Sequence, residues 1–344
     1  MAGKSRIKKI LLPAVSVIIL IPLIILAVNF NKIRTIASIS KAGKGLYTMS
    51  CYTDIKTDKL LNANISTLDD LISWIIDEQV GPLPLKANRE NFGCATFSCK
   101  TPEGETLFGR NFDYAETDTA VIYTDPDNGY ASYSLADLKV MDLGAGKIDP
   151  ESAKGRAYML AAPYMCVDGL NEAGLAIGIL ELETAEIHLD NGKPDLLIFC
   201  AIRAILDKCA TVDEATELLN RYDIHSGLDS SYHLHIVDKQ GNSAVVEWLD
   251  NQMQINKINA ATNSVLTPGK HFLEGSPDIR ITTLNRTLEK NKGTLTEDKA
   301  RDLLKAVSQR NYTEWSCVYN TKQVKVDIYM DEDYKTPYSF GGQK

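Results

Sequence analysis

The order of the predicted elements indicates an α+β protein in which two antiparallel sheets stack face to face and helices cover both outer sides. Strands come first, a pair of helices follows, and more strands, a second pair of helices and two last strands complete the order. The chain of 344 residues is 44% apolar and 24% charged, which is typical of a globular protein with a large core. We expect one four-layer αββα sandwich over residues 94–344.

A segment without charges precedes this domain and predicts a membrane anchor. Residues 10–30 contain no charged side chain, and a run of about 20 apolar residues is long enough to cross a bilayer as a helix. Residues 1–9 form a basic tail without acidic residues, which predicts a cytoplasmic amino terminus and places the domain at 94–344 outside the cytoplasm. Signal peptides usually have shorter apolar cores, so we favour a retained single-pass anchor in the cell membrane. Cleavage near residues 35–38, which would give a secreted protein, stays an alternative.

Residues 31–93 are predicted to form a basic linker, at residues 31–45, followed by a folded pro-segment. Ser66 is a suitable N-cap for a helix, because apolar side chains recur at helical spacing between Leu68 and Ile76. We therefore expect a pro-region or a docking element here, and not a loose tether.

From Cys94 onward the pattern changes to strands joined by turns. The first two strands form a predicted hairpin, because Pro102 and Gly104 suit a type I turn between them. The next two are expected to flank a turn at residues 168–174. The predicted strands are 95–100, 105–111, 158–167, 175–182, 232–237, 243–248, 254–262, 314–319 and 324–329.

Two pairs of helices interrupt the strands. Residues 196–208 are apolar on nearly every face, which predicts a helix between layers, and Thr211 with Glu214 forms a capping box for the next helix. The second pair is predicted at residues 277–289 and 297–308.

Cys94 is the residue that best indicates function. If the chain is cut after Gly93, Cys94 carries both a thiol nucleophile and a free α-amine, whose pKa near 8 suits a general base. Arg110 on the returning strand favours the thiolate, and Asp113 is placed to orient the amine. An odd count of seven cysteines without a CxxC pair leaves at least one thiol free in an exported protein, and we expect that thiol to be Cys94.

Acyl transfer also needs donors for the oxyanion of the tetrahedral intermediate. Asn171, in a glycine-bounded turn, and Asn263, within the sequence Ala-Thr-Asn-Ser, are the predicted side chains.

These motifs together resemble those of a known family. Arg110 lies sixteen residues after Cys94 within the sequence FGRNFD, and the sequences DGLNEAGL (168–175) and TNS (262–264) follow. The set is similar to the motifs of the choloylglycine hydrolase and linear amide hydrolase family, which belongs to the N-terminal nucleophile hydrolases. The resemblance extends from Cys94 to near Phe340 and implies the αββα fold of that class.

The resemblance also implies the members of the site. They are Cys94, Arg110, Asp113, Asn171, Asn263 and Arg280. Arg286 lies close enough to compete with Arg280. The long leader is more similar to the branch with isopenicillin N acyltransferase, acid ceramidase and the acid amidase for N-acylethanolamines, which implies self-cleavage between Gly93 and Cys94. Glycine suits this step because the absence of a side chain lets the thiol approach the preceding carbonyl.

The function expected from this resemblance is that of a self-processing cysteine amidase. It would hydrolyse a linear amide C–N bond of an N-acylated small molecule through a thioester, and bile-salt conjugates, penicillin V, N-acyl amines and N-acyl amino acids all remain open as substrates. No cofactor is expected, and no metal, because His233 and His235 lack a third ligand at useful spacing. The net charge of −8 argues against nucleic-acid binding. Homo-oligomerisation is left open.

Two other functions stay open. A papain-like cysteine hydrolase would need a histidine base, but none of the five histidines lies in a supporting local motif. A catalytically inactive, membrane-anchored binding protein on the same scaffold would keep the fold, and its chain would stay uncut.

Overall fold

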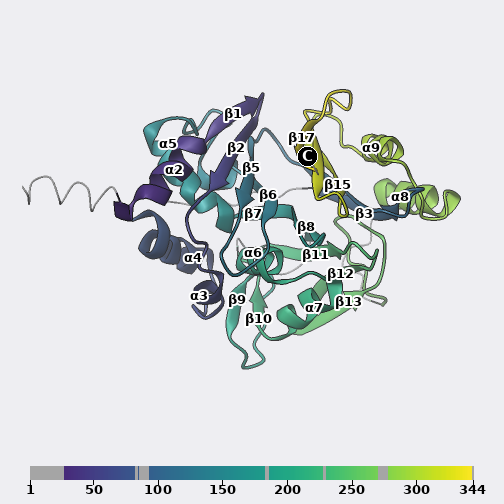
Figure 1. Cartoon of the computed structure of the whole chain (residues 1–344). Coiled ribbons are helices and arrows are strands. Elements are labelled where there is room, and N and C mark those ends of the chain that lie inside the picture. The colour runs from purple at the N-terminus through teal and green to yellow at the C-terminus, as the bar shows by residue number, and fades with distance from the viewer. Residues whose placement is uncertain are drawn as a thin grey trace, which may run out of the picture.

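Two large stacked sheets form the centre of the molecule (Figure 1). The structure, a computed structural model, describes residues 27–81, 84, 93–182, 186–227, 230–269 and 278–342. The nine-stranded sheet has the order β1 (Ser40–Gly43), β2 (Leu46–Cys51), β5 (Thr119–Thr124), β6 (Ser132–Asp137), β7 (Cys166–Asn171), β8 (Ala176–Leu182), β11 (Ser231–Val237), β12 (Ser243–Leu249) and β13 (Gln252–Asn256). The six-stranded sheet has the order β14 (Ala260–Ala261), β3 (Gly93–Lys100), β4 (Thr106–Asp113), β15 (Thr313–Asn320), β16 (Lys325–Met330) and β17 (Tyr338–Gly341).

The predicted α+β architecture with antiparallel sheets is confirmed, with two differences. The pair β2 and β5 is parallel, and a small parallel pair, β9 (Asp195–Leu197) with β10 (Asp223–His225), forms a third sheet.

Helices cover the outer faces of both large sheets (Figure 1). On the six-stranded sheet, α8 (Ile279–Lys290) and α9 (Glu297–Ala306) pack their apolar side chains against those of β3 and β4. On the nine-stranded sheet lie α6 (Ile198–Lys208) and α7 (Val212–Asn220). Every residue of α6 except Lys208 is buried, as its apolar sequence predicts. Short helical segments complete the structure: α5 (Ala153–Tyr158), the 3-10 helices η2 (Lys139–Met141) and η3 (Met159–Tyr164), and the leader elements described next.

The leader is built into the sandwich. Its elements are α2 (Phe30–Ser38), β1, β2, α3 (Thr57–Leu61), α4 (Leu68–Ile75) and the π-helix η1 (Ile76–Val80). The predicted linker at residues 31–45 is therefore wrong, because it contains most of α2 and all of β1. The predicted helix is present, but Thr67 is its N-cap, in a capping box with Asp70.

Several strand predictions differ from the structure. Residues 158–164 are helical, not extended, and β7 begins only at Cys166. This apolar run is buried throughout, so periodicity could not separate helix from strand. The predicted strand 254–262 is divided between β13 and β14, which lie in different sheets, so the chain crosses from one sheet to the other there. The sequence analysis predicts no strand at the positions of β1, β2, β5, β6, β9, β10 and β17.

The predicted membrane anchor falls mostly outside the described residues, since only 27–30 of the segment 10–30 are described. Among the described helices, none is long and apolar enough to span a bilayer.

Candidate active site

Cys94 lies near the start of β3 and points between the two sheets. Side chains alternate along the strand, so Cys94 packs in the core between the sheets, whereas Cys99 packs in the core under α8 and α9. The two thiols therefore face opposite surfaces of β3. The Cys94 thiol is fully buried and lies 3.6 Å from the carbonyl oxygen of Ile179. Burial raises the pKa of this thiol to about 12, although the charges of Arg110 and Arg280 oppose the shift. In the uncut chain the thiol is therefore protonated at neutral pH.

Three predicted residues surround the peptide bond between Gly93 and Cys94. Asn263 Oδ1 accepts a hydrogen bond of 2.8 Å from the Cys94 amide nitrogen. Arg280 Nη1 donates to the Cys94 carbonyl oxygen at 3.1 Å and to Asp113 Oδ2 at 3.1 Å. Arg280 Nη2 donates to Asn263 Oδ1 at 3.0 Å, which closes the ring of contacts. The structure thus favours Arg280 over Arg286 for the last position of the site.

Asp113 is held by residues that the sequence did not predict. Thr313 Oγ1 donates to Asp113 Oδ1 at 2.5 Å, and Gln309 Nε2 donates to Oδ2 at 2.9 Å. Burial raises the pKa of the Asp113 carboxyl, and the bond from Thr313 and the charge of Arg280 oppose this rise. Gly93 packs directly on this group, since a Cβ there would lie 3.0 Å from Asp113 Cβ and 2.7 Å from Gln309 Nε2. A side chain at position 93 would therefore displace Gln309 from its bond to Asp113.

Arg110 is fixed by a buried ion pair. Its Nε lies 2.5 Å from Asp168 Oδ2, both side chains are inaccessible to solvent, and the Tyr319 hydroxyl donates to the other oxygen of Asp168. Arg110 Nη1 donates to the Ile179 carbonyl at 2.5 Å, the same oxygen that the Cys94 thiol contacts. Asp168, in the DGLN motif, is thus a positioning residue that places a cation beside the thiol.

Asn171, from the same motif, does not join the site. Its Nδ2 donates to the carbonyls of Leu206 and Cys209 at 2.9 and 2.7 Å, and its Oδ1 accepts from the Leu175 amide at 3.0 Å. Asn171 pairs with Leu175 across the β7–β8 hairpin. Leu175 precedes Ile179, which contacts the thiol, by four residues, so Asn171 lies about 13 Å along the strand from the site. The prediction of Asn171 as an oxyanion donor is therefore wrong, because its amide group is committed to the turn and to α6.

Glu181 is a site residue that sequence analysis missed. It lies on β8 two residues after Ile179 and hence on the same side of the strand. Its carbonyl accepts from Asn263 Nδ2 at 2.8 Å, and its buried carboxylate accepts from Ser230 at 3.0 Å. Its negative charge contributes to the raised pKa of Cys94. The alternation of β8 was the signal that could have identified it.

The histidines within the described residues are engaged elsewhere. His233 bonds Glu247 and the Thr262 carbonyl, His235 bonds Thr96 and Ser243, and His188 bonds His225. His271 lies outside the described residues. The described structure gives no support to a papain-like pair of cysteine and histidine.

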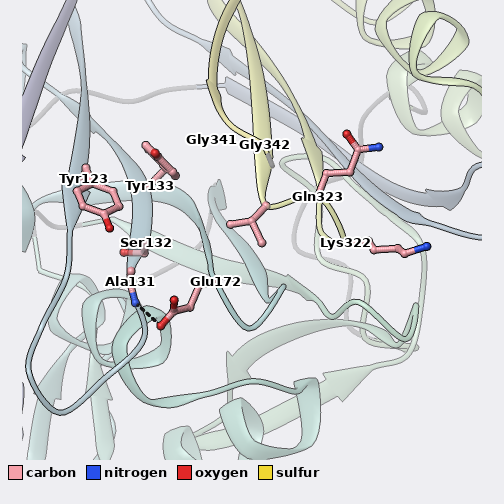
Figure 2. Close-up of a pocket in the computed structure, with 10 residues that line it drawn as sticks. Tyr123, Ala131, Ser132, Tyr133, Glu172, Lys322, Gln323, Gly341 and Gly342 are labelled. Atoms are coloured by element: carbon pink, nitrogen blue, oxygen red, sulfur yellow. Dashed lines mark hydrogen bonds between the residues drawn. The ribbon is translucent and has the colours of Figure 1, made fainter. Parts of the chain in front are cut away.

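A cavity of about 270 Å³ opens at the opposite end of the sheets. Figure 2 shows Tyr123, Tyr133 and Glu172 on one side of it and Lys322 and Gln323 on the other. Lys322 also approaches Glu105, in the turn that follows β3. Cys94 lies at the other end of β3, about 20 Å away, so this cavity is separate from the site.

Comparison with known proteins identifies the family. Residues 153–332, just over half of the chain, match the family described as acyl-coenzyme A:6-aminopenicillanic acid acyl-transferase. The chain belongs to this family. The predicted resemblance to choloylglycine hydrolases and other N-terminal nucleophile hydrolases is confirmed.

This acyl-transferase family member is also similar in sequence to one curated protein and in fold to solved structures. It is 31% identical over 122 residues to penicillin V acylase from Pectobacterium atrosepticum, which covers 32% of this chain and 31% of that protein. The match therefore spans about a third of the curated relative's length. The fold is similar to that of a mutant conjugated bile acid hydrolase from Clostridium perfringens, with a TM-score of 0.53, 16% identity, and coverage of 72% of this chain and 92% of the other. A second variant of that hydrolase gives a TM-score of 0.52 at 15% identity.

Proposed function

We propose that this protein is a self-processing cysteine amidase that hydrolyses a linear amide C–N bond of an N-acylated small molecule. The observation that carries the proposal is the ring of contacts around the peptide bond that precedes Cys94. Asn263 holds the amide nitrogen, Arg280 holds the next carbonyl, and Gly93 leaves the approach to its carbonyl carbon unobstructed by a side chain.

The processing step is an acyl shift from nitrogen to sulfur. The Cys94 Sγ forms a bond to the Gly93 carbonyl carbon, the C–N bond breaks, and the thiol proton passes to the released amine. Water then cleaves the thioester, which frees the Gly93 carboxylate and regenerates the thiol. The nitrogen that Asn263 contacts in the uncut chain becomes the α-amine that serves as base in the mature enzyme.

Turnover repeats this chemistry on an external amide. The thiolate adds to the substrate carbonyl, Asn263 stabilises the oxyanion, and the protonated α-amine gives its proton to the leaving amine. Water, deprotonated by the α-amine, hydrolyses the thioester and releases the acid. The relatives are named for penicillin V and for conjugated bile acids, and N-acyl amines and N-acyl amino acids present the same bond.

A matched pair of variants tests this proposal. Cys94→Ala is expected to abolish both cutting and amide turnover, whereas Cys99→Ala, which changes a buried thiol on the other face of β3, is expected to leave both intact. Intact mass and amino-terminal sequencing measure the cut, and amine release from a panel of N-acyl amides measures turnover. A wild-type chain that stays uncut and inactive contradicts the proposal and favours the binding protein.

We also propose that residues 10–30 anchor the chain in the cell membrane with the amidase domain outside. The absence of charge in this segment and the basic tail before it support the proposal. The full chain is expected to stay with membranes in alkaline carbonate and to be digested by protease added outside intact cells. Release of the chain by carbonate would contradict the anchor.

A further inference from the structure

Exposed apolar side chains are concentrated on one side of the molecule. Within the described residues the large apolar side chains that face solvent are Val28, Phe30, Ile33, Tyr52, Ile255, Ile279 and Tyr312. The first four lie on α2 or next to it, whereas the others are scattered. Single exposed apolar residues are normal, but a cluster indicates an interaction surface.

The outward face of α2 has the composition of a buried face. Among its exposed residues, which also include Asn31, the positions Phe30, Ile33, Arg34 and Ala37 recur at helical spacing and form one stripe, while Thr35 points inward. The Arg34 guanidinium lies 3.8 Å from the ring centre of Tyr52 and 5.8 Å from that of Phe30, so these side chains are contiguous. The outward face of a surface helix is normally polar. We call Val28, Phe30, Ile33, Arg34 and Tyr52 the α2 face.

The chain before and after α2 indicates what covers this face. Residues 10–26, which lead directly into it, contain no charge, and residues 27–53 contain four basic side chains and no acidic one in a protein of net charge −8. Apolar side chains beside cations match the interface of an anionic bilayer. A second copy of the chain fits less well, because a stable dimer buries about 800 Å² on each partner, far more than these few side chains offer.

We infer that the α2 face rests on the membrane interface, with its apolar side chains at the level of the lipid headgroups. This inference rests on the membrane location proposed above and is independent of the amidase activity. Such a contact holds the amidase domain in one orientation on the bilayer, with α8 and α9, at the opposite side of the molecule, turned away from it (Figure 1).

Site-specific fluorescence on the full chain tests the orientation. All seven native cysteines are buried, so a bimane reagent labels an introduced, exposed thiol. The labelled proteins also carry Cys94→Ala, which removes the proposed nucleophile. The reporter is Ile33→Cys, and the matched control is Ile279→Cys, also an exposed isoleucine on a helix. The protein is reconstituted in vesicles of phosphatidylcholine and phosphatidylglycerol that contain doxyl-labelled lipid.

We expect the lipid quencher to quench the label at position 33 and not the label at position 279. A second reporter carries the label at Val28→Cys. Adding Arg34→Glu to this reporter is expected to reduce the quenching of its label by the lipid. Equal quenching at positions 33 and 279 overturns the inference. A label at position 33 that neither aqueous iodide nor the lipid quencher reaches also overturns it, because a protein partner then covers the α2 face. Carbonate extraction of the same vesicles reports the anchor separately, and amine release by the unlabelled enzyme reports the amidase.

Discussion

Two asparagines that the sequence places in one role have different environments. Asn263 contacts the amide nitrogen of Cys94, whereas all the bonds of Asn171 are to backbone groups of its own turn and of the end of α6. Asn263→Ala is expected to slow cutting and turnover by about 100- to 1000-fold, the usual cost of losing an oxyanion donor.

Asn171→Ala is expected to act on stability instead. It leaves buried carbonyls without donors, at about 1–3 kcal/mol for each unsatisfied group, so the urea midpoint falls while kcat of the folded, cut enzyme stays near the wild-type value. Steady-state kinetics with urea denaturation separates the two effects. A large loss of kcat in folded Asn171→Ala would show that the turn reaches the reacting atoms.

Gly93 allows a second test at the scale of one residue. A methyl group there would meet Gln309 Nε2 at 2.7 Å and Asp113 Cβ at 3.0 Å, so either Gln309 moves away from Asp113 or the backbone with the scissile carbonyl shifts. Gly93→Ala is expected to slow self-cleavage by roughly 100-fold, the cost of a misplacement near 1 Å. The rate is followed by gel densitometry after synthesis of the precursor, and circular dichroism checks the fold. Cutting at the wild-type rate in a folded variant contradicts the packing argument.

The sequence predicted Cys94, Arg110, Asp113, Asn263 and Arg280, and the structure brings these five together. It could not predict the parts of the site that depend on register between strands. Asp168 can position Arg110 because β7 places the two side chains in contact. Glu181 belongs to the site because β8 brings its carbonyl to Asn263. A motif shows which residue types are present, but only strand pairing shows which of them face the thiol.

At the scale of elements, prediction succeeded where local signals were strong. The cap at Thr211 predicted the start of α7, and the predicted helices 277–289 and 297–308 lie within two residues of the bounds of α8 and α9. It could not give the pairing of strands that are remote in sequence. The strand β2 pairs with β5, more than 60 residues later, and nothing in residues 46–51 alone indicates a parallel partner.

The position of the leader predicts that it remains attached after cutting. The strand β2 forms a parallel ladder along the whole of β5, and Tyr164 donates to the Ile55 carbonyl at 3.1 Å. Leu60 and Leu71 are fully buried. We expect the leader fragment and the chain that begins at Cys94 to elute together in native size exclusion and to separate in urea.

A pair of leader variants makes that prediction specific. Leu71→Ala is expected to cost about 2–5 kcal/mol of association, as for other buried leucines, and to lower the urea concentration at which the fragments separate. Asp69→Ala, on the exposed side of the same helix, is expected to have little effect. Separate elution of the wild-type fragments without denaturant would contradict the continuous core.

At the scale of the whole molecule, the two sheets are joined by a polar contact inside an apolar core. His235 on β11 lies between Thr96 on β3 and Ser243 on β12, at 2.8 Å from each hydroxyl. Ser243 donates its own proton to the Ile258 carbonyl, so it accepts from His235 Nε2. Burial disfavours a second ring proton, so Nδ1 accepts from Thr96, whose other acceptor, the Ala261 carbonyl, lies at 3.5 Å. The ring is therefore neutral, and its edge packs against Phe108.

This neutral histidine predicts how acid weakens the sandwich. Burial lowers the pKa of His235 from 6.5 to about 3, so between these values the unfolded chain binds a proton that the folded chain does not, and stability falls as the pH is lowered through that window. Each pKa unit corresponds to about 1.4 kcal/mol, so the loss amounts to several kcal/mol. His235→Gln keeps a donor and an acceptor but cannot titrate, so we expect it to be less stable at pH 7 and to lose less stability on acidification. Urea midpoints are measured for the wild-type protein and for His235→Gln between pH 7 and pH 4. The difference between their two losses of stability removes the contribution of the carboxylates, which both proteins share. Parallel curves for the two proteins would show that His235 is charged in the fold and that another group controls its acid stability.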